Sequence, residues 1–120
     1  MKKLLIILIL ISGMHLLFAE DVKVKTGDIF GKSAFDYFTP VAVGIKGSFT
    51  WVSSIKNIEK DLWCITLVVD SSSSHTPKYF EYYVKSGDVI NVFRFPDIQN
   101  EKRLKVKNVT WNEAVLEVTE

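Results

Sequence analysis

Residues 62–69 have the sequence Leu-Trp-Cys-Ile-Thr-Leu-Val-Val, which is almost wholly apolar and rich in β-branched side chains. β-Branched side chains are stiff at χ1 and pack well on a pleated surface, so they favour strands over helices. A continuous apolar run of this length, bounded by polar residues, is typical of a strand that is covered on both faces. The stretch therefore predicts a buried β-strand.

Strand patterns continue on both sides of this run. Residues 22–25 alternate apolar and charged side chains, as a half-buried strand does. Within 49–55, Phe49, Trp51 and Ile55 share one parity of the alternation. Gly-Asp pairs supply a residue that tolerates positive φ beside one that bonds its own backbone, which favours turns. Further strand-like segments are 78–85, 89–95, 103–107 and 113–119, and the Gly-Asp turns are 27–28 and 87–88.

No segment has a convincing apolar stripe at helical spacing. The best helix candidate is Lys32–Phe38, after Gly31 and before Pro40, and an irregular loop is the alternative there. Seven or eight short strands with turns between them predict a single all-β domain over residues 20–120. A small antiparallel barrel and a two-sheet sandwich both fit this pattern.

Residues 1–19 have the order of a secretory signal peptide. Lys2 and Lys3 form a short positive region, an apolar run follows, and Ala19 offers a small residue before the polar Glu20. An uncleaved membrane anchor is the alternative, but the apolar segment is shorter than the roughly 20 residues that a membrane-spanning helix needs. We therefore expect an exported chain that begins near Glu20 and has no membrane span after cleavage, in the periplasm or outside the cell.

Charge and composition exclude several classes of function. The chain of 120 residues has 15 Lys+Arg, 14 Asp+Glu and one Cys, and 48% of it is hydrophobic. A net charge of +1 argues against a nucleic-acid binder, and the hydrophobic content argues against a disordered chain. A single cysteine leaves no internal disulfide framework and no multi-cysteine zinc site. The sequence accordingly predicts no cofactor, no metal site and no nucleic-acid partner.

A faint internal repeat has a period of sixty residues. Residues 24–29, Val-Lys-Thr-Gly-Asp-Ile, match residues 84–89, Val-Lys-Ser-Gly-Asp-Val, and Thr50-Trp51 matches Thr110-Trp111 at the same offset. The match indicates either a duplicated β unit or the reuse of one turn sequence in an all-β chain.

Aromatic residues in segment 78–85 are the most informative candidates for a binding site. Tyr79 and Tyr83 share one face of the predicted strand with Glu81, whereas Phe80 and Tyr82 share the other. If the second face is not covered, it presents tyrosines to solvent, and exposed Tyr and Trp are favoured at binding surfaces. His75 lies in the Ser-rich loop at the rim of this strand. The alternative is that both faces are covered.

A second candidate surface is basic. Arg103, Lys105 and Lys107 share one face of a predicted strand, which is suited either to an anionic ligand or to the protection of a sheet edge. Glutamates nearby, such as Glu113 and Glu117, are expected to offset the charge.

Nothing in the sequence indicates catalysis. His75 is the only histidine after residue 19, and adjacent serines on one loop do not supply the rigid geometry of a catalytic triad. Cys64 lies mid-strand, so a buried inert thiol is expected, with an intermolecular disulfide as the alternative. We therefore predict that the chain is not an enzyme.

The final third of the chain resembles small β-domains of bacterial secretion and pilus assembly proteins. The resemblance consists of a Gly-Asp turn and apolar strand at 86–90, followed by alternating strands at 104–106 and 115–118. It carries no functional residues over to this chain. The signal peptide, the all-β pattern, the absence of a catalytic set and the surplus of Tyr and Trp together predict an exported, non-enzymatic binding module whose partner is another envelope or extracellular protein. A carbohydrate- or cell-wall-binding module that uses the same aromatic residues is the alternative.

Overall fold

The structure is a computed structural model that describes residues 20–31, 36–70 and 76–119. Within these residues the chain is all-β, as predicted, with eight strands, one short 3-10 turn and no α-helix. The elements are β1 (Glu20–Lys25), β2 (Tyr37–Pro40), η1 (Val41–Val43), β3 (Phe49–Glu59), β4 (Leu62–Asp70), β5 (Lys78–Val84), β6 (Val89–Phe95), β7 (Asp97–Thr110) and β8 (Glu113–Thr119).

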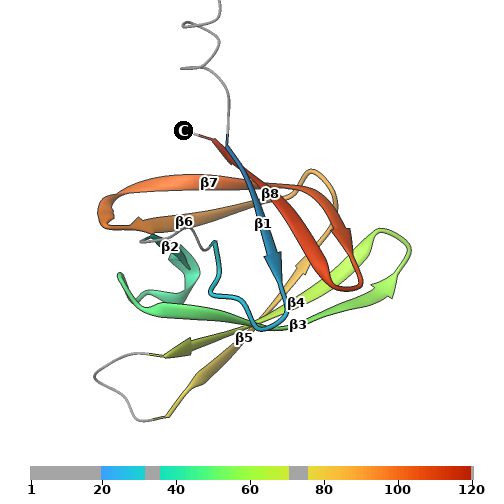
Figure 1. Cartoon of the computed structure of the whole chain (residues 1–120), viewed down its shortest axis with the longest axis horizontal. Coiled ribbons are helices and arrows are strands. Elements are labelled where there is room, and N and C mark those ends of the chain that lie inside the picture. The colour runs from blue at the N-terminus through green and yellow to red at the C-terminus, as the bar shows by residue number, and fades with distance from the viewer. Residues whose placement is uncertain (1–19, 32–35, 71–75, 120) are drawn as a thin grey trace, which may run out of the picture.

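The strands form two antiparallel sheets. The larger has the order β1-β8-β7-β6-β2, and the smaller has the order β3-β4-β5. Figure 1 shows the larger sheet curling over the smaller one as a half-barrel. The arrangement therefore combines the two predicted alternatives, because two sheets face each other as in a sandwich and one of them is curved as in a barrel.

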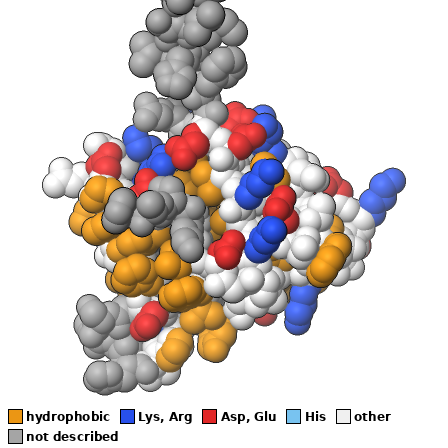
Figure 2. Space-filling model, in the orientation of Figure 1, with side chains coloured by type: hydrophobic (Ala, Val, Ile, Leu, Met, Phe, Trp, Pro, Cys, Tyr) orange, Lys and Arg blue, Asp and Glu red, His pale blue; other side chains and the backbone are white. Residues whose placement is uncertain are grey.

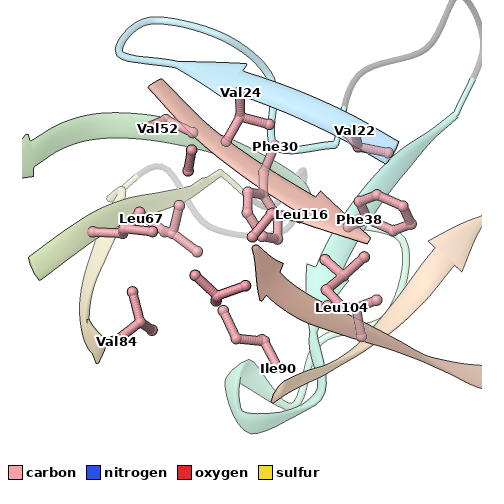
Figure 3. Packing of buried hydrophobic residues seen from close by; sticks show 14 of the residues in the cluster. Val22, Val24, Phe30, Phe38, Val52, Leu67, Val84, Ile90, Leu104 and Leu116 are labelled. Atoms are coloured by element: carbon pink, nitrogen blue, oxygen red, sulfur yellow. The ribbon is translucent and has the colours of Figure 1, made fainter. Parts of the chain in front are cut away.

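One hydrophobic core lies between the sheets. Both sheets contribute to it, with Val24, Leu104 and Leu116 from the larger and Val52 and Leu67 from the smaller, each at most 1% exposed. Figure 3 shows these side chains converging on the same space, together with Phe30 and Phe38. The inward positions alternate with exposed ones along β1 and with half-buried ones along β8, which is the period of two that the sequence predicts.

The two Gly-Asp turns occupy equivalent places in the fold. Gly27 donates its N–H to the carbonyl of Val52, and Gly87 donates to the carbonyl of Val106, both over 2.7 Å. Lys25 and Lys85 each donate an N–H to the carboxylate of the aspartate three residues later, over 3.1 and 3.0 Å. The sequence repeat therefore corresponds to a structural equivalence of the two turns. It does not extend to the tryptophans, because the partner Val52 is equivalent to Val106, so that Trp51 and Trp111 do not occupy equivalent positions.

A bulge in β3 overturns the simple parity of that segment. The pairing of β3 with β4 slips between Val52 and Ser54, so one residue is inserted and the alternation reverses. Phe49 and Trp51 consequently point outward, whereas Val52 and Ile55 are both buried. The three residues that share one parity in the sequence therefore do not share a face.

Two other local predictions need correction. The helix candidate Lys32–Phe38 is not a helix where the structure describes it, because Tyr37 and Phe38 belong to β2 and pair with Phe95 and Arg94 of β6. Residues 32–35 lie outside the described parts. Strand β4 is central, but its outward face is only half-covered at Thr66 and Val68.

An ion-pair cluster joins the two ends of the curled sheet. Arg94 of β6 donates to Glu20 at the start of β1 and to Asp36 just before β2, each over 2.9 Å. Because β7 and β8 separate β6 from β1 in the sheet order, the contact with Glu20 depends on the curl. Burial alone would lower the pKa of Arg94, but the hydrogen bonds that Arg94 donates to Glu20 and Asp36, together with their negative charges, outweigh it and raise that pKa.

Candidate binding surface

Large aromatic side chains lie on the outward face of the three-stranded sheet. Trp51 of β3 is directly opposite Val68 of β4, which is directly opposite Tyr79 of β5. Residues that are directly opposite point to the same side of a sheet, so these three form one row across it. Phe49 lies two residues before Trp51 on the same face. We call Phe49, Trp51, Val68 and Tyr79 the aromatic face.

The aromatic face is open to solvent. Tyr79 is 68% exposed, Phe49 49% and Trp51 41%. It continues into a stack of rings, because Tyr37 of β2 lies between Phe49 and Phe95 with centroids 4.7 and 4.8 Å away. Figure 2 shows hydrophobic side chains gathered on the side of the molecule where β2 and the ends of β3, β4 and β5 lie.

The connection between β2 and β3 is held in place beneath this stack. The Tyr37 hydroxyl donates to the carbonyl of Gly47 over 2.6 Å, and the Thr39 hydroxyl donates to the carbonyl of Ser48 over 2.8 Å. Desolvation by burial raises the pKa of Tyr37. These bonds fix the start of β3, so the rings of the stack are presented by a rigid support.

A second outward cluster lies further along β5. Glu81 and Tyr83 are exposed, and the Tyr83 hydroxyl donates to the Glu81 carboxylate over 2.9 Å. That hydrogen bond and the negative charge of Glu81 raise the pKa of Tyr83. Cys64 is directly opposite Tyr83 and is buried as a free thiol, 5% exposed. Cys64 is on the outward face of β4, directly opposite Lys56 on one side and Tyr83 on the other, and these two longer side chains flank it.

The structure brings together three of the four residues predicted to form the binding site on β5 and its adjoining loop. Tyr79, Glu81 and Tyr83 lie on one outward face of β5, in the alternation that the sequence indicates. His75 lies outside the described residues. Sequence reasoning missed Phe49 and Trp51 as members of this surface, because the bulge that turns them outward leaves no recognisable sequence signal. Tyr37 was missed because segment 32–38 does not have a strand pattern, and Phe95 was missed because its contact with Tyr37 depends on the pairing of β6 with β2.

The basic residues of β7 do not form a separate positive patch. Arg103, Lys105 and Lys107 are exposed on one face, but Lys105 is directly opposite Glu117 of β8. Lys107 contacts Asp21 over 3.1 Å and Glu117 over 3.6 Å. The hydrogen bond with Asp21, followed by its charge, raises the pKa of Lys107. Figure 2 shows acidic and basic side chains interspersed over β1 and β8, so this face is a solvated surface of mixed charge.

Two kinds of feature are absent from the described residues. No group of three or more His, Cys, Asp or Glu side chains in those parts is arranged to hold a metal ion. Among the same residues, no helix has the length and apolar character needed to cross a membrane.

Comparisons with known proteins give no relative from which a function can be carried over. No family model matches the chain, and neither the curated proteins nor the solved structures contain a significant match.

Proposed function

We propose that the chain is an exported, non-enzymatic β-domain that binds another protein of the cell envelope or extracellular space through the aromatic face. The observation that carries the proposal is the row Trp51–Val68–Tyr79 with Phe49 beside it on an exposed sheet face. Interface cores are enriched in aromatic residues and depleted in charged ones, and Trp and Tyr dominate their energetic centres.

Burial of these aromatic side chains in a complex is energetically favoured over their permanent exposure. An aromatic side chain buries roughly 150–250 Å² when it is covered, at about 25 cal/mol per Å² of apolar area. Tyr and Trp also lose little conformational entropy on binding, because each has only two side-chain torsions. The neighbouring ring stack Phe95–Tyr37–Phe49 widens the apolar area without adding charge.

Export is part of the proposal, and the order of residues 1–19 supports it. Among the described residues, the core begins at Val22, and Glu20 is a partner of Arg94. Cleavage after Ala19 would leave these residues in the chain. Mass spectrometry of the chain isolated from its host would give the N-terminus, which we expect at or within two residues of Glu20.

The binding proposal is tested by affinity capture from an envelope extract with three versions of the protein. The parent should retain one dominant protein partner, and the Trp51→Ala and Tyr79→Ala variants should lose it. Trp111→Ala is the matched control, because Trp111 is 77% exposed but lies in the turn between β7 and β8, away from the aromatic face. Equal capture by the parent and both aromatic-face variants would overturn the assignment of the surface.

A carbohydrate- or cell-wall-binding module is the second candidate function. Trp51 and Tyr79 are two strand spacings apart, roughly 10 Å, and their rings share one sheet face on which sugar rings could stack. Sedimentation with isolated wall polysaccharide would distinguish the two functions. Retention by the polysaccharide that is lost in Tyr79→Ala, with no protein captured from the extract, would favour this alternative.

A further inference from the structure

Strand β5 is a sheet edge without the usual protection. It ends the order β3-β4-β5, and no strand of residues 20–31, 36–70 and 76–119 pairs with its other side. Natural proteins protect edges with charges, proline or very short strands. The two edges of the larger sheet have these devices, since four of the six residues in β1 are charged and β2 has four residues and ends at Pro40. The free side of β3, the other edge of the smaller sheet, is partly covered by backbone hydrogen bonds with residues 27–30.

The interior of β5 is well suited to strand pairing. Residues 79–84 are Tyr-Phe-Glu-Tyr-Tyr-Val, which have high strand propensity, and Glu81 is the only charge among them. The neighbouring charges, Lys78 and Lys85, lie directly before and directly after this segment. An exposed edge of this composition is a template for another extended segment.

The core-side face of β5 is incomplete. Phe80 and Tyr82 are directly opposite Leu67 and Ile65, which are each 1% exposed. Phe80 and Tyr82 themselves are only half-buried, because no further strand extends the sheet beyond them in the described parts of the chain. Desolvation already raises the pKa of Tyr82. A strand added at β5 would cover both side chains and continue the core.

The charge of Glu81 decides which segment fits. A second copy of the chain, paired antiparallel over the whole of β5, would place Glu81 directly opposite its own symmetry mate, and like charges in that position are destabilising. A basic residue opposite Glu81 is instead stabilising, and its neighbours on the added strand meet Phe80 and Tyr82. Strand β5 therefore favours an added strand with a basic residue at its centre and an apolar residue on each side of it.

We infer that the protein partner docks by strand addition to β5, through an extended segment with Lys or Arg opposite Glu81 and apolar residues opposite Phe80 and Tyr82. The inference rests on the proposed function and specifies the kind of segment that the partner contributes. The aromatic face adjoins this edge through Tyr79, so a partner strand at β5 lies beside Tyr79, and the partner contacts Trp51 only if it also extends across the outward face over Val68.

The test uses isotopically labelled protein and two capped nonapeptides. The first is Gly-Thr-Thr-Val-Arg-Val-Thr-Thr-Gly, and the second has Glu in place of Arg. Both sequences are symmetric, so parallel and antiparallel docking present the same side chains. Binding is followed by amide exchange and chemical shifts of β5, for the parent, Glu81→Lys and Glu59→Lys. Glu59 is an exposed glutamate at the end of β3, so its variant is a control for the change of net charge.

The expected result is a preference of about tenfold for the Arg peptide, since an attractive cross-strand pair replaces a repulsive one. The alternate amides of β5 that point away from β4 should become protected. Glu81→Lys should reverse the preference, and Glu59→Lys should leave it unchanged. The inference is overturned if neither peptide protects β5, if Glu81→Lys does not alter the preference, or if the protein alone sediments as a dimer in which the β5 amides are already protected.

These outcomes are separable from failure of the proposed function. If the captured partner is lost in Trp51→Ala but retained in Glu81→Lys, with β5 amides unprotected in the complex, binding through the aromatic face stands and strand addition is wrong. If the capture experiment retains no partner in any version while the Arg peptide protects β5, strand addition is supported and the proposed partner class is wrong.

Discussion

Gly87 donates its backbone N–H to the carbonyl oxygen of Val106 over 2.7 Å, and Val106 in return donates its N–H to the carbonyl of Asp88 over 2.7 Å. The same reciprocal pair joins the turn at Gly27 to Val52. The first turn follows β1, which pairs with β8, and the chain after it pairs with β3 through Ile29. The second turn follows β5, which pairs with β4, and the chain after it forms β6, which pairs with β7. The turns therefore carry the chain from one sheet to the other.

Equivalent turns should respond equally to the same substitution. Gly27 and Gly87 have φ of 93° and 95°, and a Cβ at either position would meet open space. Backbone strain is then the only penalty, so Gly27→Ala and Gly87→Ala should each destabilise the fold by about 1–2 kcal/mol. Urea denaturation of both variants measures this. A large cost at one turn and none at the other would contradict their equivalence.

Gly31→Ala should be more harmful than Gly44→Ala. Both glycines have positive φ, 72° and 77°, so the backbone strain is comparable. At Gly31, however, a Cβ would lie 1.6 Å from Cδ2 of the buried Phe38, whereas at Gly44 it would meet open space. Displacing Phe38 adds an overpacking penalty of about 1–3 kcal/mol. Denaturation midpoints that are the same for the two variants would show that the ring moves aside freely.

Substitutions on the aromatic face should reduce partner binding with little effect on the stability of the fold. Trp51→Ser and Tyr79→Ser should change the free energy of unfolding by less than about 1 kcal/mol, because both side chains are substantially exposed. Leu67→Ala, on the opposite face of the same sheet, should cost about 2–5 kcal/mol because Leu67 is 1% exposed. Chemical denaturation distinguishes the two faces, and a severe loss of stability in Tyr79→Ser would place Tyr79 in the fold rather than in a binding surface.

The pKa of Tyr83 should depend on Glu81. The neutral hydroxyl of Tyr83 donates to the Glu81 carboxylate, and ionisation would bring two negative charges together, so the tyrosine pKa is raised. Glu81→Ala removes both effects and should lower the Tyr83 pKa toward its ordinary value. NMR titration of the tyrosine ring carbons gives the shift directly. Glu59→Ala serves as the control and should leave the Tyr83 titration unchanged.

Loss of Arg94 should loosen the curl of the larger sheet. The side chains of Arg94 and Asp36 are 23% and 20% exposed, and the Arg94 guanidinium is shared between Glu20 and Asp36. Arg94→Met leaves a mostly buried carboxylate without its cation, so we expect a loss of about 1–3 kcal/mol. Glu20→Gln should cost less, because Glu20 is half-exposed. Denaturation curves of the two variants provide the measurement, and a greater loss in Glu20→Gln would contradict this order.

Much of the candidate surface on β5 follows from local rules. Tyr79, Glu81 and Tyr83 share a face because side chains alternate along any strand, and this holds whichever strand is the neighbour. Their exposure does not follow from that rule. It depends on β5 being the edge of its sheet, and the partner of a strand lies far away in the sequence.

The sequence by itself determined the all-β class, most of the strands and the two Gly-Asp turns, because strand alternation and turn chemistry are properties of neighbouring residues. Only the tertiary structure decided that Phe49 and Trp51 face solvent, that Trp51 lies in a row with Tyr79, and that Tyr37 and Phe38 form a strand. A bulge shifts the alternation by one residue, and pairing with β6 overrides a local pattern. Both effects arise from contacts between distant segments, which no local window of the sequence contains.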